Sequence, residues 1–224
     1  MARVPDALSW NEAGGSPEAF ITSYDALVTQ AGVRAGDSVL IHAIGSGVGL
    51  AATQLVRALG ATPYGTARNH NKLIAASEAG MAEGMVPEAA GSIAAAVREW
   101  TAGRGVDVVL DLVGGAYVSE GVASLALKGR LILIGALAGR EATLNLGLVL
   151  SRRLTVRGTV LRSRPIEERI AVTQTFAREV VPWLASGTLR TRVDSTFPLS
   201  AIADAHRLME SNACIGKVVL DLRT

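Results

Sequence analysis

Short runs of apolar residues alternate along this chain with longer segments in which apolar residues recur every three or four positions. The short runs have strand length and are rich in valine, isoleucine and leucine, whereas the longer segments have the period of a helix with one buried face. Predicted strands cover 37–44, 62–67, 83–87 and 106–113, and a fifth lies within 129–139; predicted helices cover 48–60, 70–80, 91–103 and 116–127. Because the strands are apolar throughout, both faces of their sheet should be buried. The pattern predicts an α/β fold with a doubly wound parallel sheet.

The segments before residue 37 and after residue 140 do not continue this regular alternation of strands and helices. A lead-in precedes the first strand, with a predicted helix that has Ser16 as its N-cap, Pro17 at its first position and Gly32 at its end. After residue 140 the predicted order is a short helix over 144–153, a strand over 154–161 and a long helix over 165–187 that Pro182 bends or ends. A strand, a helix and a strand then follow over 188–199, 200–212 and 216–222.

A glycine-rich turn joins the first strand of the predicted sheet to its first helix. It reads Ala43-Ile-Gly45-Ser-Gly47-Val-Gly49. Unpaired amides and the positive dipole end make the start of a helix a phosphate-binding site, and glycines let the backbone approach a pyrophosphate closely. The motif alone is weak evidence, but the strand before it and the helix after it match the context of a Rossmann-type dinucleotide site.

The end of the second strand indicates which dinucleotide is bound. Sites for NAD place an acidic residue there, against the ribose hydroxyls. This chain reads "GTARNHNK" instead, with Arg68 at the strand end and Lys72 one turn into the next helix. Because paired donors of an arginine hold a phosphate, we expect NADP(H) as the cofactor. The missing acid also argues against an S-adenosylmethionine site.

Charge and composition exclude several other classes of function. The chain has 224 residues, a net charge of +2 and 4% aromatic residues. Its densest basic run, "SRRLTVRGTVLRSR" over 151–164, is interpreted as a solvated edge strand and loop, because nucleic-acid binding needs a broader basic face with aromatic residues. We therefore expect no nucleic-acid partner.

No membrane or metal partner is expected either. No apolar run is long enough to span a bilayer, and the start "MARVPDALSW" lacks the core of a signal peptide, so the expected location is cytoplasmic. Cys214 is the single cysteine, and the three histidines are far apart, so neither a disulfide within the chain nor a zinc site is predicted.

Five ordered blocks of the sequence resemble the medium-chain dehydrogenase/reductases, and most of all their zinc-independent NADPH quinone oxidoreductases, the zeta-crystallin-like branch. The blocks are "AGDSVLIHAIGSGVGLAATQLVRALGATPYGTARNHNKL", "GVDVVLDLVGGAYV", "LALKGRLILIGALAG", "VRGTVLRSRPIEE" and "FPLSAIADAHRLMESNACIGKVVLDL". The resemblance implies an NADPH-binding Rossmann domain over 1–187. Residues 188–224 correspond to a C-terminal strand–helix–strand that in relatives packs on a GroES-like catalytic domain.

The resemblance also implies where NADPH is held. The pyrophosphate is expected at Ser46, Gly47, Val48 and Gly49, and the 2′-phosphate at Thr66, Ala67, Arg68 and Lys72. The adenosine ribose is expected near Leu112, Val113 and Gly114. The nicotinamide side is expected near Gly135, Ala136 and Leu137, and near Leu161, Arg162 and Ser163. No Tyr-x-x-x-Lys or Gly-x-Ser-x-Gly set is present, so no catalytic side chain is assigned.

Relatives begin with a GroES-like domain, and residue 1 corresponds to the linker that follows it. We therefore expect the NADPH-binding portion of a reductase whose parent reaction passes a hydride from NADPH to a quinone or an α,β-unsaturated carbonyl, weak or inactive alone. It would be a shortened gene product, an excised segment, or half of a split enzyme completed by a separate GroES-like domain. A non-catalytic NADPH-sensing or scaffolding module and a polyketide synthase enoyl reductase domain remain open. The strand near 154–161 is the expected homodimer edge.

Overall fold

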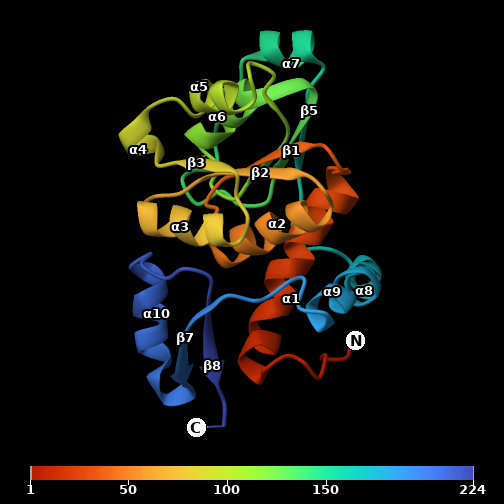
Figure 1. Ribbon diagram of the computed structural model, residues 1–224, viewed down its shortest axis with the longest axis vertical. Helices are drawn as coiled ribbons and strands as arrows, with labels where there is room; N and C mark the ends of the chain where they lie inside the picture. Colours follow the sequence, from red (N-terminus) through yellow and green to blue (C-terminus); the bar gives the residue numbers. More distant parts are fainter. Residues whose placement is uncertain (1, 224) are drawn as a thin grey trace.

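The computed structural model describes residues 2–223 and contains a six-stranded parallel sheet in the order β3-β2-β1-β4-β5-β6 (Figure 1). The strands are β1 (Ser38–Ile41), β2 (Thr62–Thr66), β3 (Glu83–Met85), β4 (Val106–Asp111), β5 (Leu125–Leu133) and β6 (Thr155–Gly158). This is the Rossmann strand order: β2 and β3 are added on one side of β1, and β4, β5 and β6 are added on its other side. The predicted fold class is therefore confirmed.

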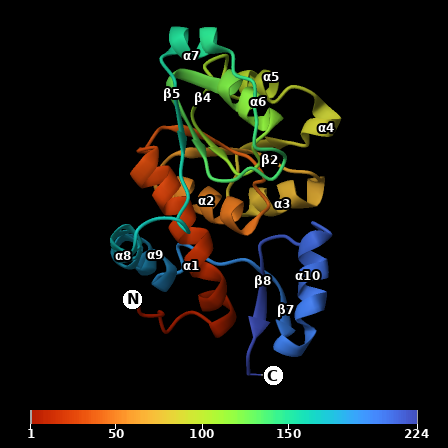
Figure 2. The same ribbon diagram turned by 180° about the vertical axis from the view of Figure 1, so that it is seen from behind.

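Helices cover both faces of this sheet (Figures 1 and 2). One face carries α2 (Gly47–Ala58) and α3 (His70–Glu78). The other carries α5 (Ile93–Trp100), α6 (Ala116–Ser124) and α7 (Leu146–Arg152), and the short helix α4 (Pro87–Ala90), which the sequence did not predict, lies between β3 and α5. All four residues of β1 are buried, because both faces of a central parallel strand lie under helices.

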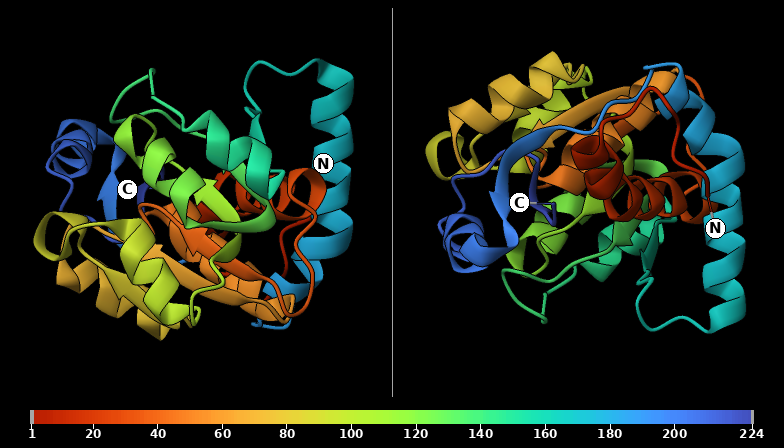
Figure 3. Two further views of the ribbon diagram at one scale, coloured as in Figure 1. Left: turned by 90° about the horizontal axis from the view of Figure 1, so that it is seen from above. Right: turned by 90° about the horizontal axis from the view of Figure 1, so that it is seen from below.

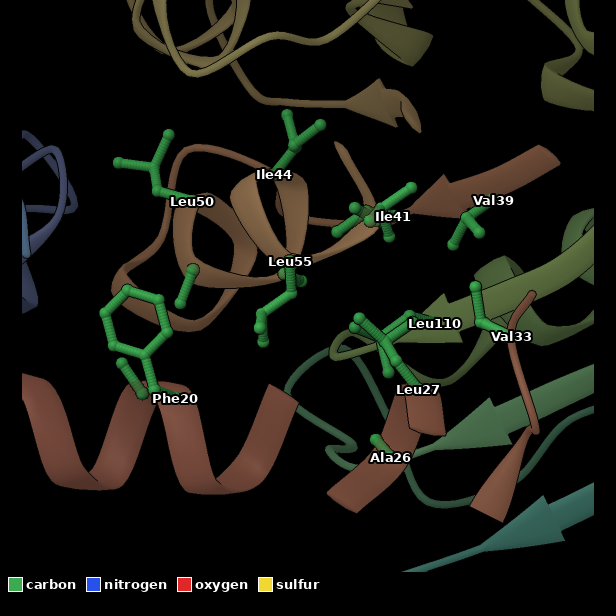
Figure 4. Close-up of a cluster of buried hydrophobic side chains, with 14 of the residues drawn as sticks. Phe20, Ala26, Leu27, Val33, Val39, Ile41, Ile44, Leu50, Leu55 and Leu110 are labelled. Atoms are coloured by element: carbon green, nitrogen blue, oxygen red, sulfur yellow. The ribbon is translucent and has the colours of Figure 1, made fainter. Parts of the chain in front are cut away.

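The larger core cluster lies between the sheet and the helices α1 (Trp10–Tyr24) and α2 (Figure 4). Phe20 of α1, Leu55 of α2, Ile41 of β1 and Leu110 of β4 are each at most 1% exposed there. A second cluster on the opposite face includes Leu40 of β1. Each Å² of apolar surface removed from water stabilises the folded state by about 25 cal/mol. These two clusters therefore hold the strands, and with them the strand ends, in fixed positions.

The lead-in helix begins earlier than predicted. Helix α1 runs over Trp10–Tyr24 and continues as the π-helical segment η1 (Asp25–Gln30). Its N-cap is Ser9, which forms a capping box with Glu12, so the prediction of Ser16 as the N-cap was wrong. Ser16 is buried inside the helix and its hydroxyl lies 2.6 Å from that of Thr191. The contact with Thr191 in the C-terminal segment thus lies on the side of the helix and not at its start.

Two other predicted helices also changed. Residues 125–127 were assigned to the end of a helix, but they begin β5, where Leu125 pairs with Val106 and is fully buried. The long helix predicted over 165–187 is divided into α8 (Ile166–Thr175), the π-helical segment η2 (Phe176–Val180) and α9 (Val181–Ala185). The π-helical segment ends just before Pro182, which lies in the first turn of α9. Proline has no N–H to donate to a preceding carbonyl, so the regular pattern of helical hydrogen bonds is interrupted there.

The C-terminal segment forms a separate parallel pair of strands. It consists of β7 (Val193–Pro198), the short 3-10 turn η3 (Leu199–Ala201), α10 (Ile202–Glu210) and β8 (Lys217–Asp221), and it packs against α1. Views from above and below place α10 on one side of the molecule and α8–α9 on the opposite side (Figure 3). The boundary predicted at 187/188 falls in the turn before β7.

Candidate functional site

The candidate site lies where the carboxyl ends of β1, β2, β4 and β5 meet at one edge of the parallel sheet. The strand order reverses between β1 and β4, and a crevice opens at such a point in doubly wound sheets. The turns after β1, β4 and β5 contain glycines that the sequence singled out, and the turn after β2 carries Arg68. The fold therefore brings turns that are distant in sequence to one edge.

The turn after β1 presents the start of α2. Ser46 is the N-cap, and its hydroxyl accepts the Gly49 amide at 3.0 Å. The amides of Gly47 and Val48, at the first two helical positions, have no acceptor within the helix. Unpaired amides and the positive end of the helix dipole favour an anion at such a position.

The glycines of this turn are required by protein neighbours. A Cβ on Gly49 would lie 2.5 Å from the carbonyl oxygen of Ile44, and one on Gly45 would lie 2.5 Å from the Cβ of Lys72. A Cβ on Gly47 would lie 2.3 Å from the Cδ of Lys217. These glycines thus allow close approach by neighbouring atoms of the protein itself, including the stems of Lys72 and Lys217.

Two positive charges stand beside the glycine turn. Arg68 is exposed at the end of β2, and Lys72 is 8% exposed in the first turn of α3, where its stem packs on Gly45. Burial and then the nearby charge of Arg68 lower the pKa of Lys72 below its ordinary value. Within residues 2–223, neither side chain forms an ion pair with a carboxylate. The charge of Asp194 acts on Lys72 from further away, but it does not form an ion pair with it, so the two cations favour an anion.

Thr66 does not contribute its side chain to this cationic group. Its hydroxyl lies 3.0 Å from Nδ1 of His42, and the residue is 1% exposed. Successive side chains of a strand point to opposite faces of the sheet, and the side chain of Thr66 points into the core. The prediction that Thr66 surrounds a 2′-phosphate can hold only through its backbone.

The turns after β4 and β5 are joined to each other. The carboxylate of Asp111 accepts the amides of Val113 at 2.7 Å and Gly114 at 2.9 Å. Gly114 has φ +73°, and a Cβ there would lie 2.8 Å from the Cα of Ala136. The predicted residues after β4 and those after β5 therefore lie side by side, with Leu137 86% exposed at the rim.

Residues 161–163 follow β6, the strand next to β5, and they belong to a loop that Arg164 anchors. Arg164 donates from its guanidinium to both carboxylate oxygens of Asp25, at 3.2 and 2.5 Å. The Asp25 side chain is 2% exposed and that of Arg164 is 13% exposed. The interpretation of the whole basic run as solvated was therefore wrong at Arg164. Sequence spacing held no signal for this pairing.

A buried histidine lies behind the site. His42 directly follows β1, and its ring contacts that of Tyr117 edge-on at 5.0 Å. Its Nε2 and the Oδ2 of Asp111 are buried without a hydrogen-bond partner among the described residues. Burial lowers the pKa of His42 to about 4, against the opposing charges of Asp111 and Glu120. His42 is thus neutral at pH 7.

This pKa predicts an acid-dependent loss of stability. The folded state binds fewer protons at His42 than the unfolded state between pH 6.5 and about pH 4. Stability should therefore rise with pH across this window, and the His42 contribution of roughly 3 kcal/mol should be lost as pH falls through it. Urea unfolding at several pH values is expected to show a smaller loss in His42→Gln. The exposed His206→Gln should keep the wild-type dependence; equal slopes in all three proteins would contradict the prediction.

Metal binding does not fit the described residues. Residues 2–223 contain no group of three or more histidine, cysteine, aspartate or glutamate side chains that could hold a metal ion. Within the same part of the chain, no helix combines the length and apolarity that a bilayer crossing requires.

The chain matches the family model described as zinc-binding dehydrogenase over residues 47–181. Over 98% of its length it is 34% identical to a mycocerosic acid synthase-like polyketide synthase of Mycobacterium tuberculosis, of which it covers 10%. Over 97% of its length it is 26% identical to the quinone oxidoreductase of Homo sapiens, of which it covers 64%. The chain thus spans less than two thirds of either relative.

Solved structures share the fold of the whole chain. The quinone oxidoreductase of Thermus thermophilus, solved also as a complex with NADPH, is 30% identical with a TM-score of 0.86, over 98% of this chain and 69% of the other. An NAD-dependent alcohol dehydrogenase is 34% identical with a TM-score of 0.87, over 99% of this chain and 61% of the other. From the family match over more than half of its residues and the Rossmann sheet shared with these neighbours, the chain belongs to the zinc-binding dehydrogenases among the medium-chain dehydrogenase/reductases.

Proposed function

We propose that this chain is the NADPH-binding part of a reductase that acts on a conjugated carbonyl compound, a quinone or an α,β-unsaturated carbonyl. The observation that carries the proposal is the pair of cations, Arg68 and Lys72, beside the glycine turn. An acidic residue would repel a 2′-phosphate at this position, whereas two unpaired cations attract it. The neighbour from Thermus thermophilus, which was also solved as a complex with NADPH, supports the same cofactor.

Each part of the site has a task in this proposal. The free amides of Gly47 and Val48 bind the pyrophosphate, and Arg68 with Lys72 binds the 2′-phosphate. The joined turns at Gly114 and Ala136 hold the ribose and nicotinamide side in position and exclude water from that face. When bound, the cofactor supplies a hydride. The described residues thus bind and orient, and they contribute no assigned acid or base.

Among the α,β-unsaturated carbonyls, an enoyl thioester is the specific candidate to set against a quinone. Several polyketide synthases are 31–35% identical to this chain, including the mycobacterial relative and the erythronolide synthase of Saccharopolyspora erythraea. Parallel assays with a quinone and with an enoyl thioester, with and without a GroES-like domain added in trans, separate the two substrates. Binding of NADPH without reduction of either compound in any of these assays would favour the sensing or scaffolding module.

Replacement of Arg68 by alanine tests the cofactor. A lost charge-assisted hydrogen bond is worth about 1.5–3 kcal/mol, so the Kd for NADPH is expected to rise roughly 10- to 100-fold. The Kd for NADH should change little, because NADH has no 2′-phosphate. Fluorescence titrations with both nucleotides measure the two constants. The exposed Arg98→Ala, on α5, is the matched control, and equal weakening of NADPH and NADH by Arg68→Ala would refute the assignment.

We also propose a homodimer through β6. This strand is the open edge of the sheet, and all four of its residues are exposed. Val156 is 42% exposed and Val160 is 52% exposed next to it. Unpaired edge groups and apolar side chains favour pairing with a second copy. Sedimentation equilibrium tests this; a monomer at high concentration would contradict it.

A further inference from the structure

We propose that Asn212, in the turn between α10 and β8, is a specificity-determining residue that positions the Arg68 guanidinium for the 2′-phosphate. The inference rests on the proposed function, since it concerns the same cofactor. It adds a residue from the C-terminal segment to a site otherwise formed by the Rossmann sheet. The two residues are 144 positions apart in the chain.

The contact is a single hydrogen bond that leaves most of the guanidinium free. Nη2 of Arg68 donates to Oδ1 of Asn212 at 2.5 Å. A guanidinium has five N–H donors in a planar fork, so one bond still leaves a complete pair of donors for a phosphate. Arg68 on its own would be a long, exposed side chain with many rotamers. Holding one donor restricts these rotamers before the cofactor arrives, which lowers the entropy cost of binding.

The Asn212 amide is oriented by its own turn. Nδ2 of Asn212 donates to the carbonyl of Glu210 at 3.2 Å, which leaves Oδ1 to accept from Arg68. The backbone of Asn212 is left-handed, with φ +58°, a conformation that asparagine tolerates better than most residues. An alanine there would strain the backbone. A glycine removes the side chain and leaves the backbone relaxed.

The rest of the turn is attached to the glycine turn that holds the pyrophosphate. The amide of Gly216 donates to the carbonyl of Gly45 at 3.2 Å, and Gly216 forms a backbone bridge with Ser46. Nζ of Lys217 lies 2.8 Å from the carboxylate of Glu18 on α1. The position of Asn212 relative to Arg68 is therefore set by several contacts on both sides.

The hydrogen bond between Arg68 and Asn212 leaves the positive charge of Arg68 available for a phosphate. Asn212 is a neutral acceptor, and residues 211–217, "SNACIGK", contain no acid. It orients Arg68 without neutralising it. An aspartate at this position would pair with Arg68 and place a negative charge next to the 2′-phosphate, which would repel it.

Titration of Asn212→Gly and Asn212→Asp with NADPH and with NADH tests the inference. Loss of one hydrogen bond of ordinary strength is expected to raise the Kd for NADPH about 3- to 10-fold in Asn212→Gly, with the Kd for NADH within about twofold of wild type. Asn212→Asp is expected to raise the Kd for NADPH further. Ala213→Gly, in the same exposed turn, controls for added flexibility and should bind both nucleotides as wild type does.

The possible results separate this inference from the proposed function. NADPH binding that depends on Arg68 but is unchanged in both Asn212 variants would overturn the inference alone. Equal weakening of NADPH and NADH by Asn212→Gly would assign Asn212 a general structural role and would also overturn it. If the wild-type chain binds neither nucleotide, the proposed function fails and the inference falls with it.

Discussion

Replacing Asp25 by alanine is expected to lower the free energy of unfolding by about 4 kcal/mol, because it leaves the guanidinium of Arg164 without its partner in the protein interior. The Asp25 side chain is 2% exposed and also accepts from Gln30 and Thr159. Arg164 additionally donates to the carbonyl of Val160 at 3.1 Å. The pair thus ties the loop over 161–163 to η1. Urea unfolding measures the loss.

A double variant that removes both charges gives the matched control. Asp25→Leu combined with Arg164→Met removes both charges and is expected to restore most of the stability, since neither partner remains buried alone. The exposed pair of Glu78 and Arg192, at 2.8 Å, should lose no more than about 1 kcal/mol on Glu78→Ala. Similar costs for Asp25→Ala and Glu78→Ala would show that burial of the Asp25 pair carries no special weight.

Replacing Gly49 by alanine is expected to destabilise the fold by about 3 kcal/mol and to raise the Kd for NADPH more than about 10-fold. The added Cβ would lie 2.5 and 2.6 Å from the carbonyl oxygens of Ile44 and Ala43. These are backbone atoms of the turn itself, so the turn must open. Opening moves the donor amides of α2 out of the geometry that holds a pyrophosphate.

Gly47→Ala is the matched variant in the same turn. Its Cβ would meet chiefly the flexible stem of Lys217, which can move aside, so the loss of stability should be below about 1 kcal/mol. Thermal unfolding and NADPH titration of the two variants compare them directly. A Gly49→Ala protein as stable as Gly47→Ala would contradict the packing argument.

The parallel sheet was largely predictable from the sequence. The runs containing Val39–Ile41 and Val108–Leu110 are apolar at every position, and only strands covered on both faces have this pattern. The glycine turn and Arg68 were also predictable, because each follows directly from the end of a predicted strand. Element boundaries were less predictable: Ser16 was the expected N-cap of the first helix, but the structure places the cap at Ser9.

The sequence by itself determined the strand–turn–helix order, the glycine turn at the start of α2 and the replacement of an acid by Arg68. These features depend on residues within a few positions of one another, and local backbone geometry translates their spacing into structure. Only the tertiary structure decided that Asn212 meets Arg68 and that Arg164 pairs with Asp25, across 144 and 139 positions. Such contacts depend on how the whole chain packs, and no local pattern of polar and apolar residues records which distant partner a side chain will reach.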